Sequence, residues 1–228
     1  MMFKNEQAVK DYSIATDTGS EEQMKIAVYC GSTAGNREAF TIGAVALGVW
    51  IAEGGHTLVY GGAQGGLMGT IANAVLSNDG KVTGVLPDVE SIKKRRHPGL
   101  TAYIETKDMA ERKAKMMEIA DAYVALPGGP GTLDEISDVI ALARLGIDGK
   151  PCVLYDLDGF YQPLKKVFEK MIDSGFAYQE DFRNVLISPI SKRSERLSKK
   201  EGWRKNEKSI ISDRYAKCMR WRKACGIF

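Results

Sequence analysis

The sequence predicts an α/β protein whose single domain is built on a doubly wound parallel sheet. Short apolar stretches alternate with stretches of helical spacing along most of the 228 residues. Hydrophobic residues make up 44% of the chain, enough for one sizeable core. Right-handed βαβ crossovers would join such strands in parallel, which is the Rossmann-like arrangement. The predicted strands lie near residues 26–30, 57–60, 81–86, 101–105, 121–126, 151–154 and 183–187.

Two of these strands run directly into glycine-bearing loops. Strand 26–30 is followed by a short polar turn and then a helix, and strand 57–60 is followed by the glycine-rich segment 61–69 and a second helix. In an open parallel sheet such loops converge on a crevice outside the carboxyl ends of the strands, where ligands bind. The predicted ligand contacts in these two loops are Gly31, Ser32, Gly62 and Gly66.

A third loop of the same kind joins strand 121–126 to a helix whose apolar residues recur from Leu133 to Ala143. Its glycines let a ligand approach the backbone closely, and the free N–H groups and positive end of the helix favour an anion. Glu135 lies one turn into that helix, beside the anion. The predicted phosphate contacts are Gly128, Gly129, Gly131 and Thr132.

The spacing of Thr132 and Glu135 also fits a capping box, in which Glu135 would reach back to the backbone of Thr132. That alternative would make Glu135 purely structural. A cap needs neither the three glycines nor the two prolines of segment 127–131. The composition of the loop therefore favours a ligand site over a cap.

Arg112 is the second candidate catalytic residue. A helix predicted to start near Asp108 has an apolar stripe at Met109, Met116 and Met117, and Arg112 falls on the edge of that stripe. A charge in this position needs a partner. Arg112 would either bind a ligand, or snorkel or pair with a structural carboxylate.

The loops lack two well-known nucleotide signatures. None matches G-x-G-x-x-G, and the lysine of a G-x-x-x-x-G-K-[ST] loop is absent. A monophosphate is therefore favoured over a dinucleotide or a triphosphate.

Three motifs in this order resemble the LONELY GUY (LOG) family of cytokinin riboside 5′-monophosphate phosphoribohydrolases. They are segment 61–69, the Arg112-Lys113 pair and segment 127–135, and the similarity runs from about Met24 to about Ser188. Members often carry the label "possible lysine decarboxylase". We find no recognisable lysine motif for pyridoxal phosphate, so no cofactor is expected.

The resemblance implies hydrolysis of the N-glycosidic bond of a cytokinin or adenine-type nucleoside 5′-monophosphate, releasing free base and ribose 5-phosphate. It makes Arg112 and Glu135 the catalytic pair, places the phosphate on the loop from Gly128 to Thr132, and brings Lys113 and Met109 to the substrate. The chemistry suits these residues. A carboxylate can stabilise an oxocarbenium ion or activate water, and a guanidinium fork can bind phosphate or ribose oxygens.

Two other functions fit parts of the pattern. A nucleotide or cofactor carrier on the same fold would keep the phosphate loop but would not need both Arg112 and Glu135. A broader purine or pyrimidine nucleotide nucleosidase would keep the phosphate loop, Arg112 and Glu135. Ala110 stands where many relatives have histidine, and Ala63 replaces a common glycine, so either could alter the fit of the substrate.

The resemblance also implies a homodimer, with the helices that carry Arg112 and Glu135 near the two-fold axis. One apolar helical face could serve the interface or the core. Its residues are Phe160, Tyr161, Leu164 and Phe168.

Composition points to a cytoplasmic enzyme without a metal. The chain has no apolar run of membrane-spanning length, and its first 23 residues lack the apolar centre of a signal peptide. Its four cysteines are read most simply as reduced thiols, and its two histidines belong to no Cys/His cluster.

The ends of the chain differ from the domain 24–190. Residues 1–23 are polar and aperiodic and are interpreted as a flexible or non-native extension. Residues 191–228 hold 13 Lys or Arg and 4 Asp or Glu. This basic tail could bind RNA or an anionic surface, but without a recognisable RNA-binding motif a poorly ordered extension is favoured. The family pattern stops abruptly after Pro189, as a late shift of reading frame would also cause.

Overall fold

The computed structural model describes residues 23–189, which form one seven-stranded parallel sheet of order β4-β3-β2-β1-β5-β6-β7. The doubly wound α/β prediction is confirmed, and each predicted strand is present within two residues. The two predicted extensions lie outside the described residues, apart from Gln23. The strands are β1 Lys25–Tyr29, β2 Thr57–Tyr60, β3 Lys81–Pro87, β4 Ala102–Thr106, β5 Ala122–Ala125, β6 Cys152–Asp156 and β7 Val185–Pro189.

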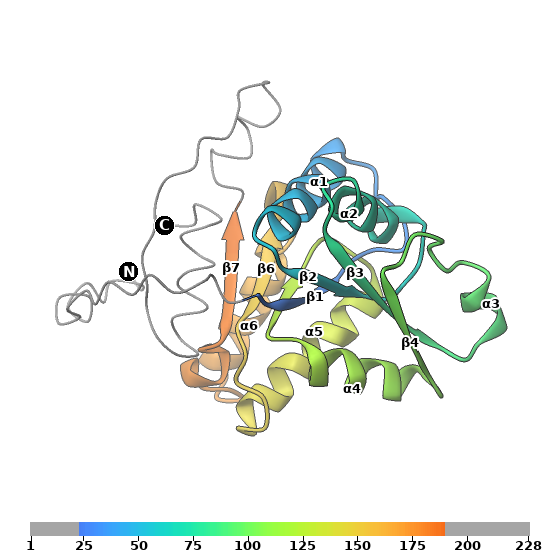
Figure 1. The fold of residues 1–228 in the computed structure, drawn as a ribbon. Helices are drawn as coiled ribbons and strands as arrows, with labels where there is room; N and C mark the ends of the chain where they lie inside the picture. Colours follow the sequence, from blue (N-terminus) through green and yellow to red (C-terminus); the bar gives the residue numbers. More distant parts are fainter. Residues whose placement is uncertain (1–22, 190–228) are drawn as a thin grey trace, which may run out of the picture.

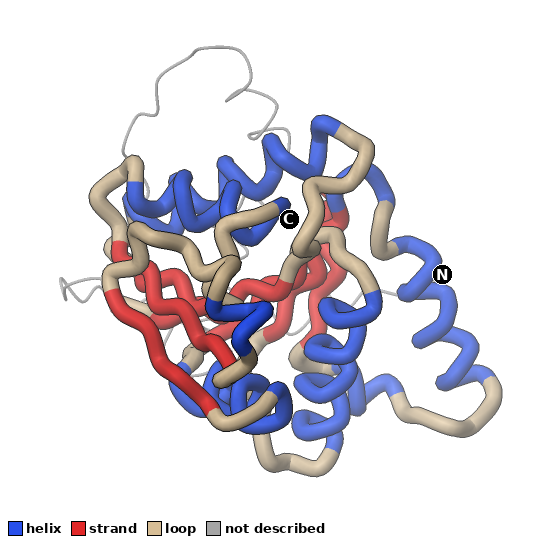
Figure 2. Tube along the Cα trace, turned by 90° about the vertical axis from the view of Figure 1, so that its right-hand side faces the viewer, coloured by secondary structure: helices blue, strands red, loops and turns tan. Residues whose placement is uncertain are grey.

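Helices cover both faces of the sheet, as Figures 1 and 2 show. Helices α1 and α2 pack on one face, and α4, α5 and α6 contribute to the apolar cluster on the other. Strands buried on both faces read as continuous apolar runs, which is why the strand pattern was visible in the sequence. The helices are α1 Glu38–Glu53, α2 Gly66–Leu76, α3 Glu90–Lys93, α4 Met109–Ile119, α5 Pro130–Arg144 and α6 Gln162–Asp173, with short 3₁₀ turns at Leu157–Gly159 and Gln179–Phe182.

The strand order reverses beside β1. The chain runs outward from β1 to β4 on one side and from β5 to β7 on the other, so the carboxyl ends of β1 and β5 are neighbours. The loops that leave them are joined by a hydrogen bond from the backbone N–H of Gly31 to the carbonyl of Pro127, at 3.1 Å. This is the switch point at which open parallel sheets bind ligands.

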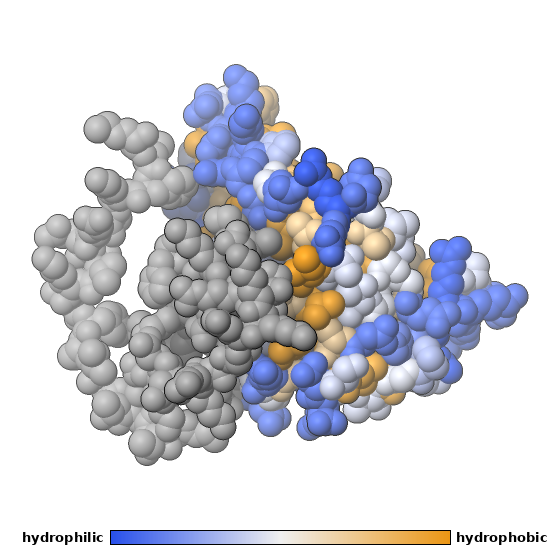
Figure 3. Space-filling model, turned by 90° about the horizontal axis from the view of Figure 1, so that it is seen from above, coloured by the Kyte–Doolittle hydropathy of each residue, from blue (hydrophilic) through white to orange (hydrophobic). Residues whose placement is uncertain are grey.

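The surface of the domain is mixed. Seen from above, apolar side chains show over α1, which exposes Ile42 and Val45, and hydrophilic residues project at the edge where α3 lies (Figure 3). Within the described part of the chain, no helix has both the length and the apolar character needed to cross a bilayer.

Candidate active site

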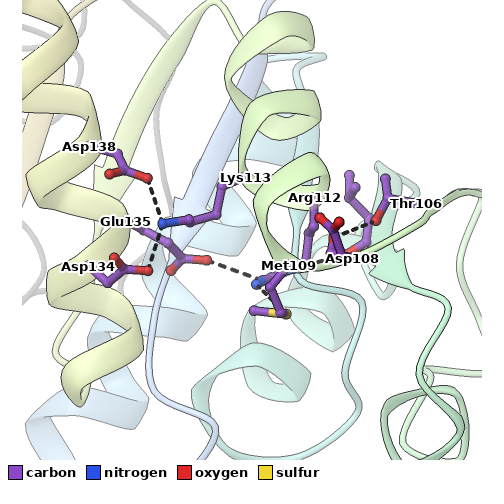
Figure 4. A network of polar contacts seen from close by, with 9 residues as sticks. Thr106, Asp108, Met109, Arg112, Lys113, Asp134, Glu135 and Asp138 are labelled. Atoms are coloured by element: carbon purple, nitrogen blue, oxygen red, sulfur yellow. Dashed lines mark hydrogen bonds and ion pairs between the residues drawn. The ribbon is translucent and has the colours of Figure 1, made fainter.

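Helix α4 places Arg112 beneath the crevice. The helix begins after Asp108, whose side chain accepts a hydrogen bond from the backbone N–H of Glu111 at 2.9 Å and so caps the first turn. One turn in, the guanidinium Nε of Arg112 donates to the carbonyl of Val85 at 3.2 Å. Its Nη2 lies 3.2 Å from Oε1 of Glu135, and only 12% of the Arg112 side chain is exposed. The partner required by the sequence is therefore a carboxylate on α5 (Figure 4).

The second glycine loop leaves room for this guanidinium. A Cβ built on Gly61 would overlap Nη2 of Arg112 and lie 3.2 Å from the sulfur of Met68. On the open side, the sulfur of Met109 lies 4.0 Å from Nη1 of Arg112. Met109 itself is 45% exposed, and its contact with a substrate stays a prediction.

Glu135 pairs with Arg112 and does not cap its own helix. Helix α5 starts at Pro130, and its N-cap is Gly129, with no side-chain capping bond. Thr132 is thus already inside the first turn, and the capping-box alternative is wrong. The pair spans two helices, and both side chains are almost entirely buried.

The loop before α5 has an open side and a closed side. A Cβ on Gly128 would overlap the Thr132 hydroxyl and lie 3.0 Å from the backbone nitrogen of Gly31, whereas a Cβ on Gly129 or Gly131 would meet nothing within 4 Å. Thr132 is 5% exposed, and its hydroxyl lies against Gly128. The first-turn N–H groups of a helix lack intrahelical acceptors. The loop therefore offers unpaired donors beside free space, as an anion requires.

The other two glycine loops meet this one. Gly66 has φ +60°, and a Cβ there would overlap the carbonyl carbon of Ser32, so the loops after β1 and β2 touch through glycine. The N–H of Leu67 donates to the carbonyl of Thr33 at 3.4 Å. Gly31, Gly66 and the exposed Ser32 thus lie together, as predicted. Gly62 has the side chain of Leu86 on its Cβ side, so it serves packing there.

Lys113 has a different environment from that expected of a phosphate ligand. Its ammonium lies 2.9 Å from the Asp134 carboxylate and 2.7 Å from the Asp138 carboxylate, so it clamps α4 to α5 (Figure 4). The i, i+4 spacing of the two aspartates puts both on one helix face, a signal the sequence contained. A direct contact between Lys113 and substrate stays a prediction.

Sequence reasoning missed a hydrogen bond that supports the end of the strand before the Gly128–Thr132 loop. The hydroxyl of Tyr161 donates to the carbonyl of Leu126 at 2.7 Å, and the N–H of Tyr161 donates to the Asp156 carboxylate at 2.7 Å. Tyr161 was counted only as part of an apolar face. That face packs against the core: Tyr161 is 3% exposed, and Leu164 and Phe168 lie on the same apolar cluster.

Burial dominates the electrostatics of the site. It raises the pKa of Glu135 to about 7, against the opposing attraction of Arg112. Burial also raises the pKa of the Tyr29 hydroxyl and of the Cys30 thiol, with a further contribution from the nearby Glu135 charge. A carboxyl group that titrates near neutral pH suits acid–base work.

Among the residues described, no group of three or more His, Cys, Asp or Glu side chains is arranged to hold an ion. Cys30 and Cys152 are buried and form no disulfide.

The fold and the site define a Rossmann-like protein with a buried arginine–glutamate pair beside a glycine-rich loop at a helix N-terminus. A family model described as "Possible lysine decarboxylase" matches residues 68–198. The cytokinin riboside 5′-monophosphate phosphoribohydrolase LOG of Oryza sativa subsp. japonica is 42% identical over 171 residues, covering 74% of this chain and 69% of the relative. The Rhodococcoides fascians phosphoribohydrolase is 42% identical over 163 residues, covering 71% and 82%. The chain belongs to the LOG family, as the motifs predicted.

Solved structures of carrier proteins share the fold. A Moco carrier protein from Chlamydomonas reinhardtii superposes with a TM-score of 0.55 at 26% identity, covering 78% of this chain and 96% of that one. A molybdenum cofactor binding protein from Rippkaea orientalis gives 0.58 at 23% identity, covering 79% and 98%. The second likeness concerns the fold alone.

Proposed function

We propose that this protein hydrolyses the N-glycosidic bond of a cytokinin or adenine-type nucleoside 5′-monophosphate, releasing the free base and ribose 5-phosphate. The observation that carries the proposal is the Arg112–Glu135 pair, buried at 3.2 Å beside an open loop with unpaired donors. Two relatives at 42% identity bear the name of this activity. The test is incubation with a panel of nucleosides and nucleotides, followed by chromatography of the released base.

In this mechanism the loop from Gly128 to Thr132 holds the phosphate, and the ribose lies over the Arg112–Glu135 pair. Breaking the C1′–N bond builds positive charge on the sugar ring, which a buried carboxylate stabilises more strongly than it would in water. Arg112 binds phosphate or ribose oxygens through its remaining N–H groups and holds Glu135 in place.

A carrier function is the second candidate, because the solved neighbours include proteins named for a cofactor that they carry. A carrier needs the anion loop but gains nothing from burying a carboxylate whose pKa is raised to about 7. Base release in the panel separates the two functions. Release from purine and pyrimidine monophosphates alike would indicate the broader nucleosidase.

We expect cleavage to require a 5′-monophosphate. The loop makes its binding energy available at the ribose only when an anion occupies it, so a nucleoside should be cleaved at least about 100-fold more slowly than its monophosphate. The measurement is kcat/KM for AMP against adenosine at one pH. Equal values for the two would contradict the phosphate-loop assignment.

We also propose a homodimer. Helices α4 and α5 expose Met109 (45%) and Leu133 (47%) close to Arg112 and Glu135, which supports an interface there. The face of Phe160, Tyr161, Leu164 and Phe168 is a weaker candidate, because Tyr161, Leu164 and Phe168 pack in or against the core. As a further proposal, the lack of a disulfide at the buried Cys30 and Cys152 supports a reducing, cytoplasmic location.

Leu133→Glu is expected to convert the dimer to a monomer, because a charge at a desolvated two-fold contact has no partner. Light scattering of the two proteins checks this result. Leu145→Glu, at the far end of α5 and 70% exposed, is the matched control and should stay dimeric. A wild-type monomer with full activity would refute the dimer.

A further inference from the structure

Glu135 has one close counter-ion and little contact with water. Its carboxylate is 9% exposed, and Arg112 is the ion-pair partner at 3.2 Å. Arg112 also donates to the backbone carbonyl of Val85, which fixes the direction of the guanidinium. The ionised state of Glu135 thus depends mainly on Arg112, with a smaller contribution from Lys113.

The other groups near Glu135 do not add a second cation at close range. Strand β1 contributes the neutral Tyr29 and Cys30, and Tyr161, just before α6, also feels the charge of Glu135. On α5, Asp134 adds a negative charge, and on α4 the Lys113 ammonium is held by Asp134 and Asp138. Burial, with a smaller contribution from the Asp134 charge, raises the pKa of Glu135 to about 7 against the opposing attraction of Arg112 and Lys113.

The Gly128–Thr132 loop leads into the first turn of α5, directly before the turn that carries Glu135. Thr132 precedes Glu135 by three residues, so the two side chains lie on neighbouring turns, about 5 Å apart along the axis. A phosphoryl group in the loop would bring up to two negative charges into this low-dielectric region. Like charges at such range disfavour the ionised carboxylate.

We propose that binding of a phosphoryl group in the Gly128–Thr132 loop drives uptake of a proton by Glu135. The substrate itself thereby converts Glu135 into a protonated carboxylic acid. The proposal rests on the proposed function only in placing the phosphate in this loop. Its geometric basis is a buried carboxylate with one cation on α4 and the anion site one turn away on its own helix.

The proton gained in this way has a use in the reaction. Glu135 donates it to a ring nitrogen of the base as the C1′–N bond breaks and its electron pair leaves with the base. The resulting carboxylate then faces the oxocarbenium ion. Water adds to C1′ and gives up a proton, which returns to Glu135, so the cycle closes with one water consumed.

Calorimetry with ribose 5-phosphate at pH 8 tests the proposal without turnover. At this pH the ligand is a dianion, since its second pKa is about 6, and Glu135 is mostly ionised. The binding enthalpy measured in buffers of different ionisation enthalpy should report uptake of about half a proton. Affinity for the ligand should also fall as pH rises from 7 to 9, by up to about tenfold per pH unit.

Two variants identify the group that takes the proton. Glu135→Gln should still bind ribose 5-phosphate but show no proton uptake and a flat affinity above pH 7. Asp138→Asn removes a carboxylate one turn further from the loop and should behave like wild type. Binding without uptake in wild type, or equal uptake in Glu135→Gln, would overturn the proposal while leaving the proposed function standing. If ribose 5-phosphate does not bind at all, the phosphate site itself is wrong, and this proposal falls with it.

Discussion

Glu135→Gln is expected to lower turnover by about two orders of magnitude or more while the protein stays folded. Glutamine keeps the shape of the side chain and can still accept a hydrogen bond from Arg112, but it neither carries the negative charge nor exchanges a proton. Affinity for AMP should change little at neutral pH, because the phosphate loop is untouched. Base release, AMP affinity and the melting temperature check the three parts of this result.

Arg112→Ala provides the contrast. It removes donors to the substrate and leaves the buried Glu135 without its counter-ion, so both turnover and affinity should fall. The melting temperature should fall as well, most of all at high pH, where the buried Glu135 carboxylate is ionised and has lost its counter-ion. If Glu135→Gln kept near-normal turnover and melted much earlier, the pair would be structural, and the catalytic assignment would fail.

The sequence predicted the central strands β1, β2 and β5 well because they are buried on both faces, whereas the edge strand β4 is largely exposed. Stretches such as Ile26–Cys30 and Thr57–Tyr60 are apolar throughout and end at glycines, so both their position and their direction into a loop are readable. Alternate residues of β1 face opposite sides of the sheet. Ile26 and Val28 belong to one core cluster, and Ala27 and Tyr29 belong to the other. The sequence analysis predicted a doubly wound sheet, but the order of its strands is known only from the structure.

The site was predictable as a set of residues but less so as a set of partners. Arg112 needed a partner on the sequence evidence, yet only the crossing of α4 and α5 shows that Glu135 is that partner. The capping-box reading failed for a local reason: Pro130 takes the first helical position, which makes Gly129 the N-cap and leaves Thr132 free to face the loop.

Hydrogen bonds between residues far apart in the sequence could not be predicted from sequence patterns. Tyr161 holds the carbonyl of Leu126 across 35 residues, and no spacing rule connects the two. Lys113 is a different case. Its adjacency to Arg112 suggested a shared role, but the side chains of successive helical residues point about 100° apart. Arg112 therefore reaches the crevice, whereas Lys113 pairs with Asp134 and Asp138.

Gly131→Ala is expected to leave the fold intact and to weaken binding of the phosphate. An added Cβ at this position meets nothing within 4 Å, and alanine favours a helix over glycine by up to about 1 kcal/mol, so the melting temperature should hold or rise. A ligand that fills the free space would meet the new methyl group. We therefore expect kcat/KM for AMP to fall by about tenfold or more, with most of the loss in KM.

Gly128→Ala is the matched opposite, because its Cβ would overlap the Thr132 hydroxyl and crowd the backbone of Gly31. It should lower both the melting temperature and the activity. The pair of variants separates the closed side of the loop, where glycine serves the packing of the protein, from the open side, where glycine serves the ligand. If Gly131→Ala left KM for AMP unchanged, the space beside Gly131 would not hold the phosphate, and the anion would have to lie against Ser32 and Gly66 instead.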